Sequence, residues 1–172
     1  MKTLKNTFAI LLVTVLAFSC GNDDAPAPAP APPATSDYFL RAKVDGVQYE
    51  AVAPRVLASK ATDRLTIGSI LPDNRTFELV IDLPTGAGTG TYSYPMPSTA
   101  NYILGMSYDE GTSTNAIWRT GACSGTSGTL TITALSATEV SGTFSFIGKR
   151  TSFCSNPAKI ITEGSFKSGI TQ

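Results

Sequence analysis

The absence of histidine decides much of the chemistry that is open to this chain. None of its 172 residues is a histidine. Serine–histidine–aspartate and cysteine–histidine nucleophiles are therefore excluded, and so are metal sites that depend on imidazole. Zinc has only cysteine thiols as soft ligands. We expect no catalytic centre of these kinds, no metal and no cofactor.

Carboxylates are the remaining groups that could catalyse hydrolysis. A glycosidase needs two of them converging across a cleft. The candidates are Asp45, Glu50, Asp63, Asp73, Glu78, Asp82, Asp109, Glu110, Glu139 and Glu163. Most fall at expected turns or on exposed strand faces, and their spacing selects no pair. A noncatalytic protein is the leading expectation, and a hydrolase with paired carboxylates is the third hypothesis.

Aromatic side chains gather in one stretch between Gly90 and Thr120. They are Tyr92, Tyr94, Tyr102, Tyr108 and Trp118. Such side chains combine a flat apolar face with a polar edge, which suits stacking on sugars or contact with a partner protein. Their even spacing within strands describes core packing equally well. These five residues are candidate ligand-binding residues, with the core as the open alternative.

The charge balance argues against nucleic acid as a partner. The chain has 13 basic and 13 acidic residues, and no basic stripe occurs along it. Nucleic-acid binding proteins need a clustered positive surface to neutralise phosphates. The partners left open are a glycan, a peptide or another protein.

The elements that must position these residues are predicted to be β-strands. After residue 36 no window sustains a helical apolar pattern, while two-residue alternation recurs. Ten to eleven short strands with regular turns are typical of an antiparallel β-sandwich, or alternatively of a closed antiparallel barrel. The expected strands are 38–44, 47–51, 55–59, 64–71, 77–83, 91–94, 101–108, 116–120, 129–135, 141–147 and 159–167.

Two turns have clear signatures. Asp45-Gly46 joins the first two strands as a two-residue type I′ turn, since both residues tolerate a positive φ. In the later hairpin Leu135 is expected to face Val140, so that paired positions sum to 275. Cys123 and Cys154 sum to 277 and would lie nearly opposite each other on its extension. The sequence thus predicts a disulfide between them, with two buried thiols as the alternative.

The first nineteen residues resemble a secretion signal. Lys2 and Lys5 precede an apolar run of eleven residues, 8–18, which would span only roughly 16 Å as a helix, about half of a bilayer core. The run ends at Ala17-Phe18-Ser19-Cys20, which resembles the lipobox of bacterial lipoprotein precursors. This resemblance implies that Cys20 carries the lipid, and the alternative is a plain secretory signal. The Asp23-Asp24 pair resembles the surface-export signal of Bacteroidetes lipoproteins.

Residues 20–36 are expected to form a tether between the lipid and a single domain of residues 37–172. The alternating alanine and proline of 25–33 cannot form a helix or a sheet, because proline fixes φ and lacks an N–H donor. An extended polyproline II segment of this length would reach roughly 50 Å.

Several motifs resemble a family of small uncharacterised Bacteroidetes lipoproteins. They are the opening 39–46 (FLRAKVDG), Gly90-Thr91-Tyr92, and the stretches 128–133, 140–146 and 161–166. The resemblance implies an exported β-domain at the outer membrane, and implies no activity. Our leading hypothesis is a lipid-anchored, noncatalytic binding module on the cell surface. The second hypothesis is a structural or assembly subunit with no small ligand, which would present a flat apolar patch or an open sheet edge.

Overall fold

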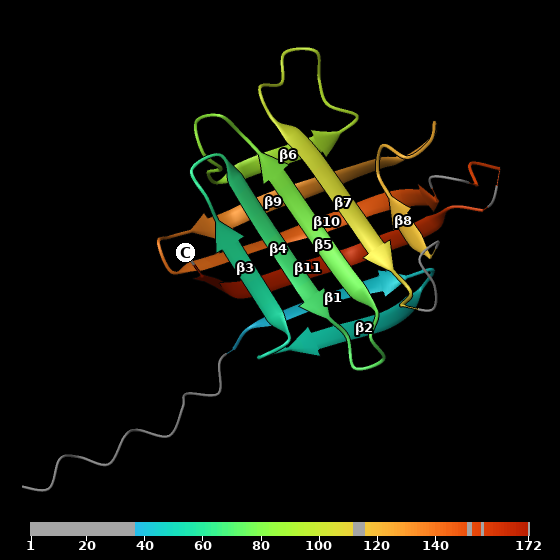
Figure 1. The fold of residues 1–172 in the computed structure, drawn as a ribbon, viewed down its shortest axis with the longest axis horizontal. Helices are drawn as coiled ribbons and strands as arrows, with labels where there is room; N and C mark the ends of the chain where they lie inside the picture. The colour runs from blue at the N-terminus through green and yellow to red at the C-terminus, as the bar shows by residue number, and fades with distance from the viewer. Residues whose placement is uncertain (1–36, 112–115, 151–152, 156, 172) are drawn as a thin grey trace, which may run out of the picture. The chain divides into compact units, whose positions relative to one another are not determined.

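The computed structural model describes residues 37–111, 116–150, 153–155 and 157–171 (Figure 1). The predicted signal, Cys20 and the tether lie outside these residues. The described part is all-β, as predicted, and each expected strand is found. The strands are β1 (Phe39–Val44), β2 (Val47–Val52), β3 (Val56–Lys60), β4 (Arg64–Ile70), β5 (Thr76–Asp82), β6 (Gly90–Tyr94), β7 (Ile103–Asp109), β8 (Ile117–Arg119), β9 (Ser127–Leu135), β10 (Glu139–Arg150) and β11 (Lys159–Thr171).

The strands form two packed layers, which makes the fold a β-sandwich. Layer A has the order β2-β1-β11-β10-β9-β6, and layer B has the order β3-β4-β5-β7-β8. In Figure 1 the green and yellow strands of layer B cross in front of the strands of layer A. Because β6 pairs with β9 in layer A, β5 and β7 become direct neighbours in layer B.

Two long strands join the layers at their edges. The end of β10 pairs with β8 through Lys149 and Arg150, and the end of β11 pairs with β3 through Ile170 and Thr171. The β11–β3 pairing is parallel, whereas the other described pairings are antiparallel. The strands do not form an evenly closed barrel, and the arrangement is compatible with the sandwich. In β11, Glu163 has a φ of 52° where the register with both neighbours shifts. Such a bulge bends a strand.

The first hairpin forms as predicted. Val44 pairs with Val47 across Asp45 and Gly46, whose φ values are 49° and 86°. Two consecutive residues with positive φ define the type I′ turn.

The disulfide between Cys123 and Cys154 is present, with Cα atoms 5.5 Å apart, but the reasoning from the β9–β10 register was incomplete. Val140 does pair with Leu135, yet a bulge at Ser141/Gly142 shifts the register, and this pairing ends at Ser127. Beyond that point β10 pairs with β8. The bond therefore joins the segments that follow β8 and β10, two strands whose ends pair with each other.

The core lies between the layers and follows the predicted alternation. The inner face of layer B is buried at positions such as Leu65, Ile67, Leu79 and Ile81, each 0 % exposed. The described residues include no helix with the length and hydrophobicity that crossing a membrane would require.

Candidate functional site

The outer face of layer B carries a surface depression next to exposed apolar side chains. Alternation turns every second residue of β3, β4, β5, β7 and β8 outward. Three of these outward residues are large, highly exposed aliphatic side chains that line the depression: Leu57 59 %, Ile70 51 % and Ile117 38 %. Scattered exposed apolar residues are ordinary on a protein surface, but a cluster around a hollow indicates binding.

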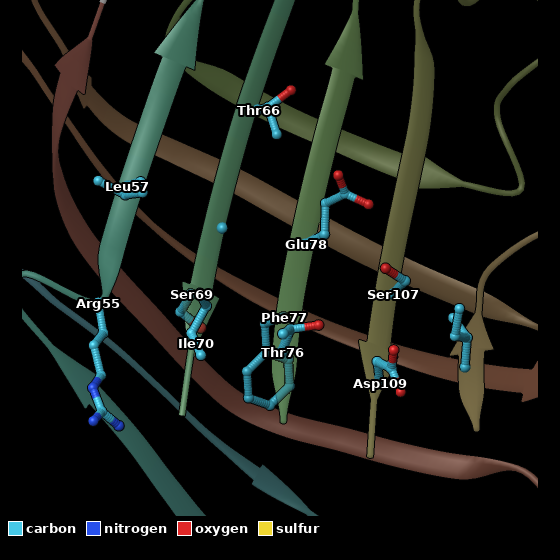
Figure 2. Close-up of a pocket in the computed structure, with 12 residues that line it drawn as sticks. Arg55, Leu57, Thr66, Ser69, Ile70, Thr76, Phe77, Glu78, Ser107 and Asp109 are labelled. Carbon is cyan, nitrogen blue, oxygen red and sulfur yellow. The ribbon is translucent and has the colours of Figure 1, made fainter. Parts of the chain in front are cut away.

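Two strand glycines form the floor of this hollow. Gly68 of β4 pairs with Glu78 of β5, and Gly105 of β7 pairs with Val80 of β5. Neither glycine has a side chain to fill the outer face, and a Cβ on Gly105 would meet nothing within 4 Å. Two adjoining depressions of about 380 and 270 Å³ result, sharing Glu78, Ser107 and Ile117. We call them together the outer groove (Figure 2).

The charged groups that line the outer groove are two carboxylates, Glu78 and Asp109, and two guanidinium groups, Arg55 and Arg119. Glu78 projects from β5 beside Ser107 of β7, and Asp109 lies one outward position further along β7 (Figure 2). The Asp109 carboxylate accepts a hydrogen bond from the Gly111 N–H at 2.8 Å. Among the residues that the structure describes, the Glu78 carboxylate has neither a hydrogen-bond partner nor an ion pair. Arg55 lies at the rim near β3.

The groove therefore brings together two carboxylates that the sequence could not select. Glu78 and Asp109 are diagonal neighbours on adjacent strands, a relation that separates Cα atoms by about 7–8 Å. Both project from one open sheet face, whereas a glycosidase holds its carboxylates on opposite sides of a bound sugar.

The aromatic cluster does not form one exposed surface, which corrects its expected role. Tyr108 is 0 % exposed, Trp118 7 % and Tyr92 8 %, so these three belong to the core. Tyr94 and Tyr102 are half-buried and pack against it. For Tyr92, Tyr108 and Trp118 the core alternative is the one that the structure shows.

Two cationic side chains lie close to the ring of Trp118, which is itself almost fully buried. The Arg150 guanidinium carbon lies 4.8 Å from the ring centroid and the Lys159 ammonium 5.4 Å from it. Stacked cations of this kind are attracted by the negative face of the ring. The indole face is thus occupied within the protein itself.

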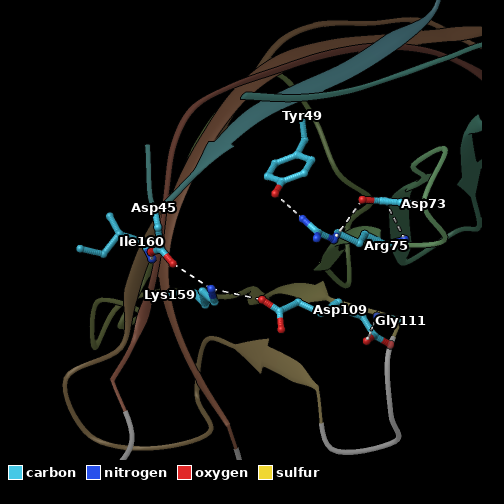
Figure 3. Close-up of polar contacts among 9 residues, drawn as sticks. Asp45, Tyr49, Asp73, Arg75, Asp109, Gly111, Lys159 and Ile160 are labelled. Atoms are coloured by element: carbon cyan, nitrogen blue, oxygen red, sulfur yellow. Dashed lines mark hydrogen bonds and ion pairs between the residues drawn. The ribbon is translucent and has the colours of Figure 1, made fainter. Parts of the chain in front are cut away.

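A second group of charged residues closes one end of the sandwich (Figure 3). The Lys159 ammonium contacts Asp45 at 2.9 Å and Glu110 at 3.1 Å, which ties β11 to the first turn and to the end of β7. Burial tends to raise the pKa of Asp45, but the Ile160 N–H and Lys159 outweigh it and lower this pKa. These charges satisfy each other, so the cluster has a structural role.

Arg75 belongs to the same end and is equally occupied. It donates to the Tyr49 hydroxyl, lies 4.7 Å from the centre of the Tyr49 ring, and pairs with Asp73 at 3.1 Å. Among the described residues, no group of three or more cysteine, aspartate or glutamate side chains is placed to hold a metal ion.

Sequence reasoning missed the outer groove because the groove depends on which strands are neighbours. The available signal was the pair of glycines inside alternating strands, at Gly68 and Gly105, together with aliphatic residues on the face expected to be wet. Glycine inside a strand often marks a close approach by another molecule.

Comparisons with protein families, with curated proteins and with solved structures find no match to this chain.

Proposed function

We propose that the protein is a noncatalytic, lipid-anchored module of the cell surface that binds a partner polypeptide in the outer groove. The observation that carries the proposal is the groove itself, with a glycine floor, exposed aliphatic walls and the Glu78 carboxylate, which forms no ion pair with any residue that the structure describes. The location rests on the signal, Cys20 and the acidic pair of the N-terminal sequence.

The side chains of the groove favour a polypeptide over a sugar at this place. Its walls are aliphatic, and its polar groups are serine, threonine and charged side chains. The groove follows β5 from Thr76 to Val80 and β7 from Gly105 to Asp109, a length of roughly 16 Å at about 3.3 Å per residue. An extended peptide of similar length would fit this dimension.

The carboxylate of Glu78 favours a partner with a positively charged side chain. It disfavours a second copy of this chain as the partner. A twofold contact centred on the groove would place Glu78 against its own copy, and like charges in a desolvated contact repel. A lysine or arginine of the partner would instead neutralise Glu78 while the aliphatic walls exclude water.

Site-specific photocrosslinking in the native membrane tests this proposal. A photoreactive residue at Leu57 should crosslink one defined protein, while the same residue at Thr143, exposed on layer A, should not. Charge reversal by Glu78→Lys should abolish the crosslink. Equal crosslinking from both faces, or a crosslink that survives Glu78→Lys, would contradict the proposal.

The anchor has its own test. Cys20→Ala removes the thiol that the lipid requires, so the variant should leave the membrane fraction, because multiple acyl chains on one residue are what makes such anchoring stable. A matched Cys123→Ala/Cys154→Ala variant should stay in the membrane fraction. Retention of Cys20→Ala in the membrane would contradict lipidation.

The assembly-subunit hypothesis is favoured by one further observation. β2 is an edge strand, pairing with β1 alone among the described strands, and Val47 and Val52 on it are each 56 % exposed. An open edge with apolar side chains can accept another strand. Crosslinks obtained from Val47 but not from Leu57 would favour this alternative.

The hydrolase hypothesis makes a different prediction for the same groove. If Glu78 and Asp109 were an acid and a base, Glu78→Gln would abolish turnover of a bound glycan, and binding would persist. We expect Glu78→Gln to weaken partner binding and to remove no hydrolytic activity.

A further inference from the structure

A second pocket lies at the other end of β5 and β7, between three loops. It has a volume of about 520 Å³, within the range of ~300–1,000 Å³ that is usual for small-molecule sites. We call it the loop-end pocket. Its walls come from Asp63 before β4, from Asp82 and Pro84 at the end of β5, and from Asn101 and Tyr102 before β7.

The loops that build the loop-end pocket are fixed by hydrogen bonds. The Leu83 N–H donates to the Asp63 carbonyl at 2.7 Å, joining two of the loops. The Tyr92 hydroxyl donates to the Gly88 carbonyl at 2.9 Å and accepts from the Gly88 N–H at 3.1 Å. These contacts form the pocket before any ligand arrives, which lowers the entropic cost of binding.

Tyr102 lines the pocket, and its hydroxyl is bound within the protein. The hydroxyl accepts a hydrogen bond from the Ser93 N–H at 2.9 Å. The ring packs edge-on against Tyr92, with centroids 5.1 Å apart and planes at 88°. A ring held in this way is a rigid apolar surface for stacking.

The charges around the loop-end pocket select against anions. Asp63 and Asp82 both line it, and Asp82 is held by Arg64, whose Nη2 donates to Oδ2 at 3.0 Å. The hydrogen bond from Arg64 lowers the pKa of the Asp82 carboxyl, which therefore stays ionised and accepts hydrogen bonds. Arg64 also interacts electrostatically with Asp63, so the two carboxylates share one guanidinium. Together with the Asn101 amide they match the hydroxyl donors and acceptors of a neutral ligand.

From this combination we infer that the loop-end pocket is a binding site for a neutral carbohydrate. A pyranose would place its apolar face on the Tyr102 ring and its hydroxyls on Asp63, Asp82 and Asn101. This site is distinct from the outer groove, so one molecule can hold a sugar and a polypeptide. Neither proposal depends on the other.

Saturation-transfer NMR on the full chain, in a detergent without a sugar headgroup, tests the inference. The probes are glucose, galactose, mannose and N-acetylglucosamine, with glucuronate and glucosamine as charged analogues. At least one neutral sugar should bind, and more tightly than either charged analogue. Asp63→Asn and Asn101→Ala should each weaken it about two- to tenfold, the effect of one hydrogen bond.

Glu50→Gln is the matched control, because Glu50 is an exposed acid on β2, in the other layer. It should leave sugar binding unchanged. The inference is overturned if no neutral sugar of the panel binds, if a charged analogue binds more tightly, or if binding is insensitive to both pocket variants.

Discussion

Two buried hydroxyls among the described residues, those of Ser69 and Tyr108, lack an ordinary hydrogen-bond partner, and Tyr108 is the larger side chain. The residue is 0 % exposed, packs 5.1 Å from Phe77, and forms no ordinary hydrogen bond within the described part of the chain. Burial raises the pKa of Tyr108 to about 12, and the nearby Arg75 offsets this only in part. A buried polar group without a partner costs stability, typically about 1–3 kcal/mol.

Tyr108→Phe should therefore raise the free energy of unfolding by about 1 kcal/mol at neutral pH, measured by urea denaturation. Tyr49→Phe is the matched control: the Tyr49 hydroxyl accepts from Arg75, so its removal should destabilise. A clear loss of stability in Tyr108→Phe would show that its hydroxyl has a partner.

The same residue predicts a pH dependence. Its folded pKa lies above the unfolded value of about 10, so the stability that it contributes is complete below pH ~10 and is lost as the pH rises through about 12. Ultraviolet titration should show a late phenolate transition in the native protein that is missing in Tyr108→Phe. A native protein in which all phenolates titrate together near pH 10 would contradict this.

At the scale of elements, the alternation predicted each described strand, because one buried face imposes a period of two. The interruptions of that period were beyond prediction. The bulges at Ser141/Gly142 and at Glu163 depend on contacts with neighbouring strands. The same contacts extend β10 and β11 beyond their predicted ends. Two strand glycines differ in the space around them: a Cβ at Gly142, on a buried face, would clash with its neighbours, whereas a Cβ at Gly105, on an outer face, would not.

Gly142→Ala should destabilise the protein by about 1–3 kcal/mol, the usual cost of overpacking. A Cβ there would lie 2.1 Å from the Thr131 carbonyl oxygen and 2.8 Å from the Phe166 ring. Gly105→Ala is the matched control, since its Cβ would meet nothing within 4 Å. It should be neutral or stabilising. Thermal unfolding should give a lower melting temperature for Gly142→Ala than for Gly105→Ala. Equal melting temperatures would contradict this prediction.

The disulfide acts on the elements that it joins. Cys123→Ser/Cys154→Ser opens a link between residues 31 positions apart. In the chain-entropy model this should lower the free energy of unfolding by about 3–4 kcal/mol. Denaturant unfolding of this variant and of the reduced native protein should agree. An unchanged midpoint in both would mean that the bond does not constrain the unfolded chain.

At the scale of the whole molecule, sequence predicted the class of fold but neither its topology nor its outer groove. The turn Asp45-Gly46 determines the pairing of the two strands that it joins. No short stretch of sequence indicates that β6 pairs with β9 in layer A or that β1 pairs with β11. Three of the five aromatic residues expected to contact a ligand, Tyr92, Tyr108 and Trp118, instead fill the core. Burial of their large apolar area contributes more stability than the desolvation of their polar edges costs.

β11 is the element on which the whole molecule depends. It pairs with β1, with β10 and with β3, and so takes part in both layers. A chain that ends at residue 158 should show no cooperative unfolding transition by circular dichroism. The matched control deletes fourteen residues, 2–15, outside the compact unit Thr35–Gln172, and should keep the transition. Cooperative melting of the truncated chain would contradict this role.

The position of β11 at the end of the chain also sets an order of events. Ribosomes and secretion channels deliver a chain from its N-terminus, so β1 emerges roughly 120 residues before the strand that completes its sheet, and such distant pairings are slow to form. The native sandwich can close only after the last strand has been delivered. For the exported protein that we propose, this order keeps the sandwich from closing before the whole chain has been delivered.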